Sequence, residues 1–180
     1  NSQLVAEAQT LTGEWEGDMT YEYTDDKTKQ RKRDRFTANM KFFQYNSSAN
    51  SLSGNGVEVD TDAKGNQQTL AFSWYVNNDG NIYIKYSRSG TVFVLDSKDK
   101  REGFHLGFES AKGYDTFYGT AYSTNTTDVM KFDLVRQRPA SAKAAPGVQT
   151  RAASQVSFGS VRQNDYANSS TGAVSRLHVR

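Results

Sequence analysis

The chain has 180 residues, of which 36% are hydrophobic and 12% aromatic, so it is long enough for one domain with a core and leaves little room for a second. Its net charge is +2 and it has no cysteine, which excludes disulfides, thiolate metal sites and cysteine nucleophiles. No apolar run approaches the roughly 18 residues that a membrane-spanning helix requires. We therefore expect a β-rich domain without a membrane-spanning helix.

Residues 1–10 are expected to be a separate N-terminal segment, because the regular pattern begins at residue 11. The first residue is Asn rather than Met, which favours removal of a secretory signal or of an expression leader. We expect a secreted or periplasmic protein. Outer-membrane anchoring through a segment absent from this chain is an open alternative.

Period-two alternation dominates residues 11–137, and it starts with Trp15, Met19, Tyr21 and Tyr23 on one face of the first run. Acidic residues occupy the opposite face, a pattern typical of a half-buried strand. The alternation recurs in later runs, whose apolar residues are Phe36, Ala38, Met40 and Phe42; Val57 and Val59; Leu70, Phe72, Trp74 and Val76; Ile82, Ile84 and Tyr86; Phe104, Leu106 and Phe108; and Met130, Phe132 and Leu134.

Glycines separate these runs at Gly65, Gly80, Gly90 and Gly113, where tight hairpins need a positive φ. The pattern predicts an all-β fold, an antiparallel up-and-down meander of about eight or nine strands that closes into a barrel. Such a barrel holds packed side chains or one small ligand. The Gly54-Asn55-Gly56 stretch lacks the pattern of a dinucleotide site, and we interpret its glycines as turn residues.

Several patterns argue against other kinds of site. The charged run at residues 25–35 lacks interleaved aromatics, and we interpret it as a solvated hairpin rather than a nucleic-acid surface. The two histidines, His105 and His178, are too few for a multi-histidine metal site. Asp60, Asp62 and Gly65 are spaced as in a calcium loop, but Lys64 occupies the third ligand position and Ala71 stands where a bidentate Glu is required, so we expect a hairpin turn. We expect no metal, no cofactor and no catalytic residue, and thus not an enzyme.

Residues 138–180 differ in composition from the rest, being rich in Ala, Ser, Gln and Arg. They contain six basic residues and one acidic residue, a net charge of +5, which leaves −3 on residues 1–137. We expect a basic C-terminal extension, either flexible or forming short strands that add to the barrel edge or mediate self-association.

Gly13-Glu14-Trp15 at the start of the first strand, together with Arg136 late in the last one, resembles the lipocalins and the wider calycin group of barrels. The hairpin FSWYVNNDGNIYI is similar to those of small secreted lipocalin-like proteins of Bacteroidetes. The resemblance implies that Trp15 closes one end of a barrel spanning residues 11–137 and that Arg136 packs across its ring. Without cysteines the usual lipocalin disulfide is absent, which indicates a distant member.

The resemblance favours non-catalytic binding of a small apolar or aromatic molecule in the barrel, with no nucleic-acid partner. The alternative is a filled barrel that binds a protein or glycan through its surface or its extension. The sequence leaves open which strand face lines the interior, since Phe43, Tyr75, Tyr83, Phe93 and Phe117 lie on the alternate faces. For a binding cup, the candidate lining residues are Tyr21, Tyr23, Phe36, Met40, Phe42, Phe72 and Trp74.

Overall fold

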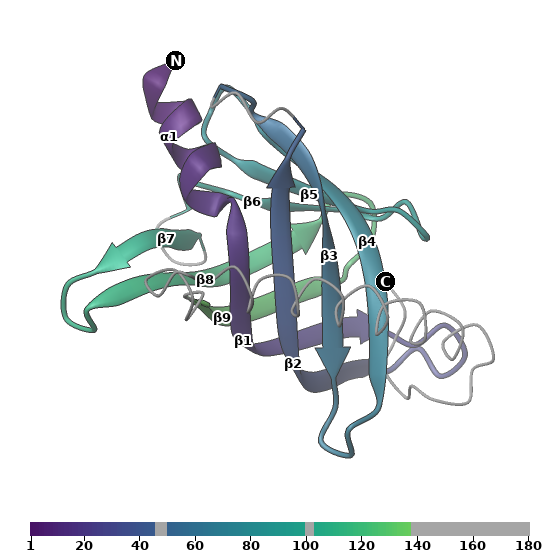
Figure 1. Ribbon diagram of the computed structural model, residues 1–180. Coiled ribbons are helices and arrows are strands. Elements are labelled where there is room, and N and C mark those ends of the chain that lie inside the picture. The colour runs from purple at the N-terminus through teal and green to yellow at the C-terminus, as the bar shows by residue number, and fades with distance from the viewer. Residues whose placement is uncertain (46–49, 100–102, 138–180) are drawn as a thin grey trace.

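Nine antiparallel strands and one short helix make up the described part of the chain, residues 1–45, 50–99 and 103–137 of the computed structural model (Figure 1). The extension predicted for residues 138–180 lies outside the described residues. The elements are α1 Ser2–Leu11, β1 Gly13–Thr24, β2 Arg31–Gln44, β3 Ser53–Thr61, β4 Gln67–Val76, β5 Ile82–Tyr86, β6 Val92–Leu95, β7 Phe104–Glu109, β8 Tyr114–Ser123 and β9 Val129–Arg136.

The strands follow the order β6-β5-β4-β3-β2-β1-β9-β8-β7, so neighbours in the sheet are almost always neighbours in sequence. A further pairing of β6 with β8, at Phe93–Ser123 and Val94–Tyr122, closes eight strands into a barrel. Strand β7 lies outside this closure and pairs with β8 along Phe104–Glu109. The predicted meander barrel is confirmed, and the four predicted turn glycines all have φ between +76° and +87°.

Helix α1 covers one end of the barrel, and the β3–β4 hairpin projects from the opposite end (Figure 1). The sequence pattern does not predict this helix, which is too short to show a sustained period. Its buried residues Leu4, Ala8 and Leu11 are spaced by four and three, which places them on one face. The Asn1 side chain caps its start by accepting a hydrogen bond from the Gln3 amide at 2.8 Å. No helix among the described residues has the length and apolarity to cross a bilayer.

Strand β3 differs from the sequence interpretation at its two glycines. Gly54 and Gly56 lie within the strand, so the interpretation of these glycines as turn residues was wrong. A side-chain carbon on Gly56 would lie 2.3 Å from the Phe72 ring, and glycine is therefore required for this ring to enter the core. The face of β3 that bears Gly56 also carries Glu58 and Asp60, both fully buried.

Gly56→Ala is expected to destabilise the protein by about 1–3 kcal/mol, because the added methyl group overpacks the contact with Phe72. Asn55→Ala is the matched control, since Asn55 is exposed on the other face of the same strand. Urea unfolding followed by tryptophan fluorescence measures both variants. Equal midpoints for the two variants would contradict the assigned orientation of β3.

Candidate functional site

The end of the barrel beneath α1 is closed by Trp15, which is fully buried. The Arg136 guanidinium lies over its indole, 4.3 Å from the ring centroid, as the resemblance implied. Strands β1 and β9 are paired at this point, with Trp15 directly opposite Arg136. The first and the last strand of the barrel therefore meet in one stacked pair.

The same two side chains bind the C-terminal end of α1. Trp15 donates its indole N–H to the Leu11 carbonyl at 2.9 Å, and Arg136 donates to the carbonyls of Thr10 and Thr12. The last carbonyls of a helix lack partners within the helix and carry a partial negative charge, so these donors and the guanidinium charge stabilise the end of α1. A salt bridge of 2.7 Å from Arg136 Nε to Asp115 fixes the guanidinium from the side of β8.

Trp15→Ala is expected to lower the free energy of unfolding by roughly 3 to 5 kcal/mol, because it leaves a cavity and removes the contact surface of Arg136. The expected signature is a lower urea midpoint together with loss of the circular dichroism contributed by α1. An unchanged midpoint would show that Trp15 does not close the barrel.

The residues predicted to line a cup face the barrel interior. Tyr21, Phe36, Met40, Phe42, Phe72 and Trp74 are each at most 7% exposed, and Tyr23 is half-buried near the end opposite α1. Phe93 and Phe117 also point inward, from β6 and β8, whereas Phe43 and Tyr75 point outward. These positions show which face of each strand is internal. Phe93 and Phe117 are interior residues that were not among the candidate lining residues.

Aromatic rings from different walls meet in the half of the interior near α1. Phe117 of β8 lies 5.5 Å from the Trp15 ring and 6.2 Å from the Phe42 ring, both in edge-to-face geometry. Trp74 donates its indole N–H to the carbonyls of Phe43 and Asn55, at 3.1 and 3.2 Å. In this half, Phe42 therefore packs against another aromatic ring, and Trp74 forms hydrogen bonds with backbone carbonyl groups.

A polar group occupies the interior farther from α1, and the sequence analysis missed it. Tyr86 donates its hydroxyl to Glu58 Oε1 at 2.5 Å, and Gln68 donates its amide to Asp60 Oδ2 at 2.9 Å. The Tyr86 hydroxyl also lies 3.6 Å from the sulfur of Met130, which projects from β9. The four polar side chains are each about 1% exposed or less. The alternation of β3 is the signal that could have revealed this group. Alternate residues of a strand lie on one face, so Glu58 and Asp60 share the face of Gly56, and Val57 lies on the other face.

Burial controls the ionisation of this group. Desolvation raises the pKa of Asp60 well above its usual range, against a smaller lowering by the hydrogen bond from Gln68. Burial, with the nearby Asp60 and Tyr21, also raises the pKa of Tyr86 well above its usual range. The interior thus favours the neutral acid, which can donate as well as accept a hydrogen bond.

Tyrosines and aspartates continue this polar interior towards the end opposite α1. The Tyr21 hydroxyl donates a short hydrogen bond to Asp128, which immediately precedes β9. The pKa of Tyr23 is raised by partial burial and by the neighbouring carboxylates of Asp34, Asp25 and Asp128. This end of the barrel is therefore aromatic and acidic rather than purely apolar.

Asp60→Asn is expected to raise the stability of the protein at neutral pH. Because Asp60 holds its proton more tightly in the folded state, the stability of the wild type falls as pH rises from the ordinary value of 3.8 through the raised folded value. The variant keeps the side-chain shape and removes this charge. Its urea midpoint should exceed that of the wild type at about pH 7 and match it at about pH 3.5.

A second acid, which is partly buried, also makes stability depend on pH, but its contribution is the same in both proteins and cancels in this comparison. Burial raises the pKa of Glu7 on α1 to about 7, and both proteins contain Glu7. Parallel stability curves for wild type and variant across this range would contradict the assigned burial of Asp60.

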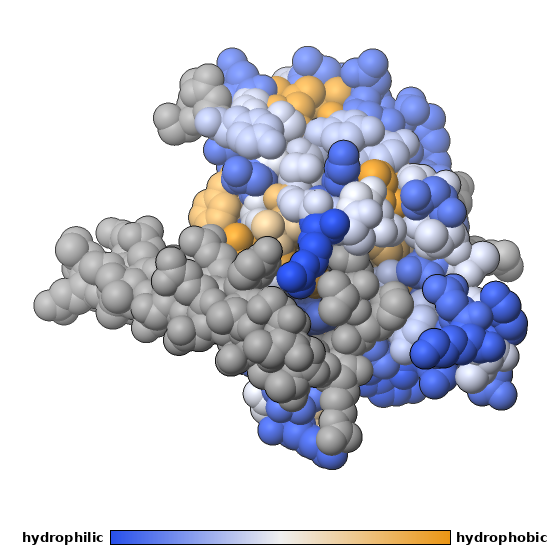
Figure 2. Space-filling view, turned by 90° about the vertical axis from the view of Figure 1, so that its right-hand side faces the viewer, coloured by the Kyte–Doolittle hydropathy of each residue, from blue (hydrophilic) through white to orange (hydrophobic). Residues whose placement is uncertain are grey.

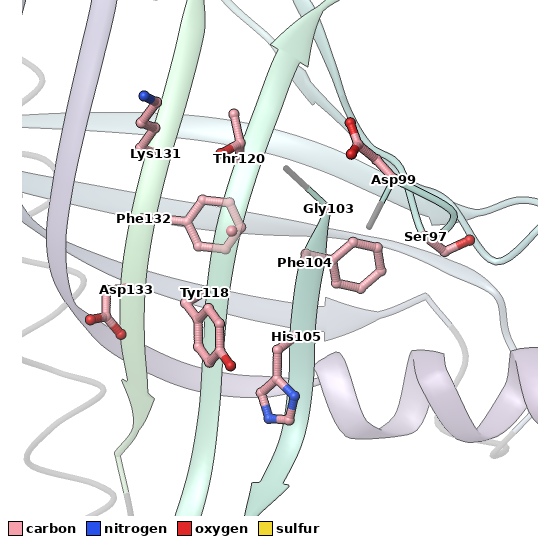
Figure 3. A pocket seen from close by; sticks show the side chains of 11 residues that line it. Ser97, Asp99, Gly103, Phe104, His105, Tyr118, Thr120, Lys131, Phe132 and Asp133 are labelled. Atoms are coloured by element: carbon pink, nitrogen blue, oxygen red, sulfur yellow. The ribbon is translucent and has the colours of Figure 1, made fainter. Parts of the chain in front are cut away.

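Outside the barrel, a groove of about 670 Å³ lies where β7, β8 and β9 run side by side (Figure 3). His105 stacks on Tyr118 with ring centroids 5.0 Å apart and an angle of 24° between the planes. Figure 3 shows Tyr118 between His105 and Asp133, with Lys131 and Thr120 beside them. The residues that line the groove are Ser97, Asp99, Gly103, Phe104, His105, Tyr118, Gly119, Thr120, Lys131, Phe132 and Asp133.

Apolar side chains at the surface are scattered. On the face shown in Figure 2, hydrophilic side chains predominate and hydrophobic ones form small separate patches. Within the described residues, the large hydrophobic side chains that are exposed are all aromatic: Phe43, Tyr45, Tyr75, Phe108, Tyr114 and Tyr118.

Comparison with known proteins gives no match: no family model, no curated protein and no solved structure is similar to this chain. Function is therefore argued from the barrel and its side chains.

Proposed function

We propose that the protein binds, without covalent chemistry, a small molecule with an apolar or aromatic body in the half of the barrel interior farther from α1. The observation that carries this proposal is the buried polar group of Glu58, Asp60, Gln68 and Tyr86. The barrel fold is compatible with a ligand, since eight-stranded barrels have room for one small molecule.

The polar group is costly for the fold, which supports a role in binding. Burial of a carboxyl group is unfavourable, as the raised pKa of Asp60 indicates, and hydrophobic residues of similar size would pack the interior more favourably. Proteins retain buried polar groups that destabilise the fold mainly at functional sites. Tyr21, Tyr23 and Phe36 supply aromatic walls beside the polar group, so the ligand combines an apolar body with one end that donates hydrogen bonds to carboxyl oxygens.

The proposal assigns no catalytic step. The interior polar group of Glu58, Asp60, Gln68 and Tyr86 consists of two carboxyls, an amide and a phenol. His105, the one histidine among the described residues, lies at the outer groove. We also propose the secreted or periplasmic location that the resemblance to lipocalin-like proteins implies.

A second candidate is a filled barrel whose surface or C-terminal extension binds a partner. The contacts of Phe117 with Trp15 and Phe42 favour it, because rings from different strands already fill the half nearest α1. The two candidates differ in what the other half contains.

Native mass spectrometry of protein purified from its own host, before and after mild organic extraction, separates them. Under the binding proposal, the unextracted protein carries a specific adduct that extraction removes. Asp60→Asn and Tyr86→Phe preserve side-chain volume and should each lose the adduct, whereas Asp18→Asn, on the outer face of β1, should keep it. A clean mass that stays unshifted with fatty acids, bile acids and aromatic amines would overturn the proposal and favour the filled barrel.

A further inference from the structure

We infer that the outer groove between β7, β8 and β9 is a second binding site, which takes a neutral oligosaccharide. It is independent of the barrel interior, because its polar residues project from the outer face of the strands. The register places His105 opposite Tyr118 and Tyr118 opposite Asp133, so three side chains form one row across the sheet. Thr120 and Lys131 form the next row.

The groove has an exposed aromatic platform. Tyr118 is 39% exposed although it is held against His105 by stacking. His105 is itself restrained by a 3.2 Å contact between its Nε2 and the Gly107 carbonyl. A ring fixed on one side and accessible on the other presents a flat apolar surface at little entropic cost. Pyranose rings carry an apolar face of C–H bonds that matches such a surface.

The rim of the groove carries the complementary hydrogen-bonding groups. Lys131 donates only, and the carboxylates of Asp133 and Asp99 accept. The Ser97 hydroxyl donates its proton to the Asp79 carbonyl at 2.9 Å and can accept from a ligand. These groups complement sugar hydroxyls, which both donate and accept. Within the described part of the chain, the side chains of Lys131 and Asp133 form no hydrogen bond or ion pair, so they are available to a ligand.

Charge and size restrict the class of saccharide. Two carboxylates against one ammonium group in the lining disfavour uronic and sialic acids, so a neutral sugar fits better. A volume of about 670 Å³ lies within the usual range for small-ligand sites and suits more than one sugar ring. The backbones of Gly103 and Gly119 meet at the base, where a side-chain carbon on Gly119 would lie 2.3 Å from the Gly103 carbonyl oxygen. Glycine at position 119 therefore allows the two backbones to approach closely at the base of the groove.

Saturation-transfer difference NMR with maltotriose, cellotriose, chitotriose and 3′-sialyllactose tests the inference. We expect transfer to the ring protons of at least one neutral trisaccharide and no stronger transfer to sialyllactose. Tyr118→Ala should abolish the signal, and Asp133→Asn should weaken it without altering the platform. Tyr114→Ala is the matched control, because Tyr114 lies on the same strand, is 40% exposed and does not line the groove.

Thermal midpoints of all variants establish that they are folded. Absence of transfer from every neutral trisaccharide, or equal signals for wild type and Tyr118→Ala, would overturn the inference. Stronger binding of sialyllactose would overturn the assignment to neutral sugars. The adduct detected in the barrel by native mass spectrometry should be unaffected by Tyr118→Ala, so failure of one proposal is distinguishable from failure of the other.

Discussion

The stacking of Arg136 on Trp15 is the contact on which the rest of the structure depends. It joins β1 to β9 where the strands meet, and it supplies donors to the carbonyls at the end of α1. Guanidinium suits this position because it stacks and donates in several directions at once, which an ammonium group does not do. The helix, the closed end of the barrel and the entry of the first strand are therefore stabilised together.

The barrel interior combines two environments. Near α1, aromatic rings pack as in an ordinary core, and the neighbouring half holds Glu58, Asp60 and Tyr86. The first environment supplies stability and the second reduces it, because burial of carboxyl groups is unfavourable. A polar interior also disfavours wholly hydrocarbon molecules, since carboxyl groups would lose hydrogen bonds against them.

The sequence predicts the barrel well because alternation and turn glycines are local signals. It leaves the inner face of β2 and β4 undecided, because Phe43 and Tyr75 are aromatic residues on the alternate faces, and only the closed barrel shows that they point outward. It fails for β3, where Val57 and Val59 carry the apolar pattern but Gly56, Glu58 and Asp60 face inward. Neighbouring strands decide that orientation, since Gly56 accommodates Phe72 from β4. The groove at Tyr118 was equally invisible, because it requires the register of three strands.

The pairing that closes the barrel is also its weakest line. Strand β6 is short and pairs with β8 at Phe93–Ser123 and Val94–Tyr122, and below this point β8 turns to β7 instead. Segments with few backbone hydrogen bonds open locally at lower free energy than the rest of a fold. Phe93 contacts both Tyr21 and Tyr86, so separation of β6 from β8 would uncover the polar interior directly. For the ligand that we propose, entry and exit would then be limited by the rate of this opening.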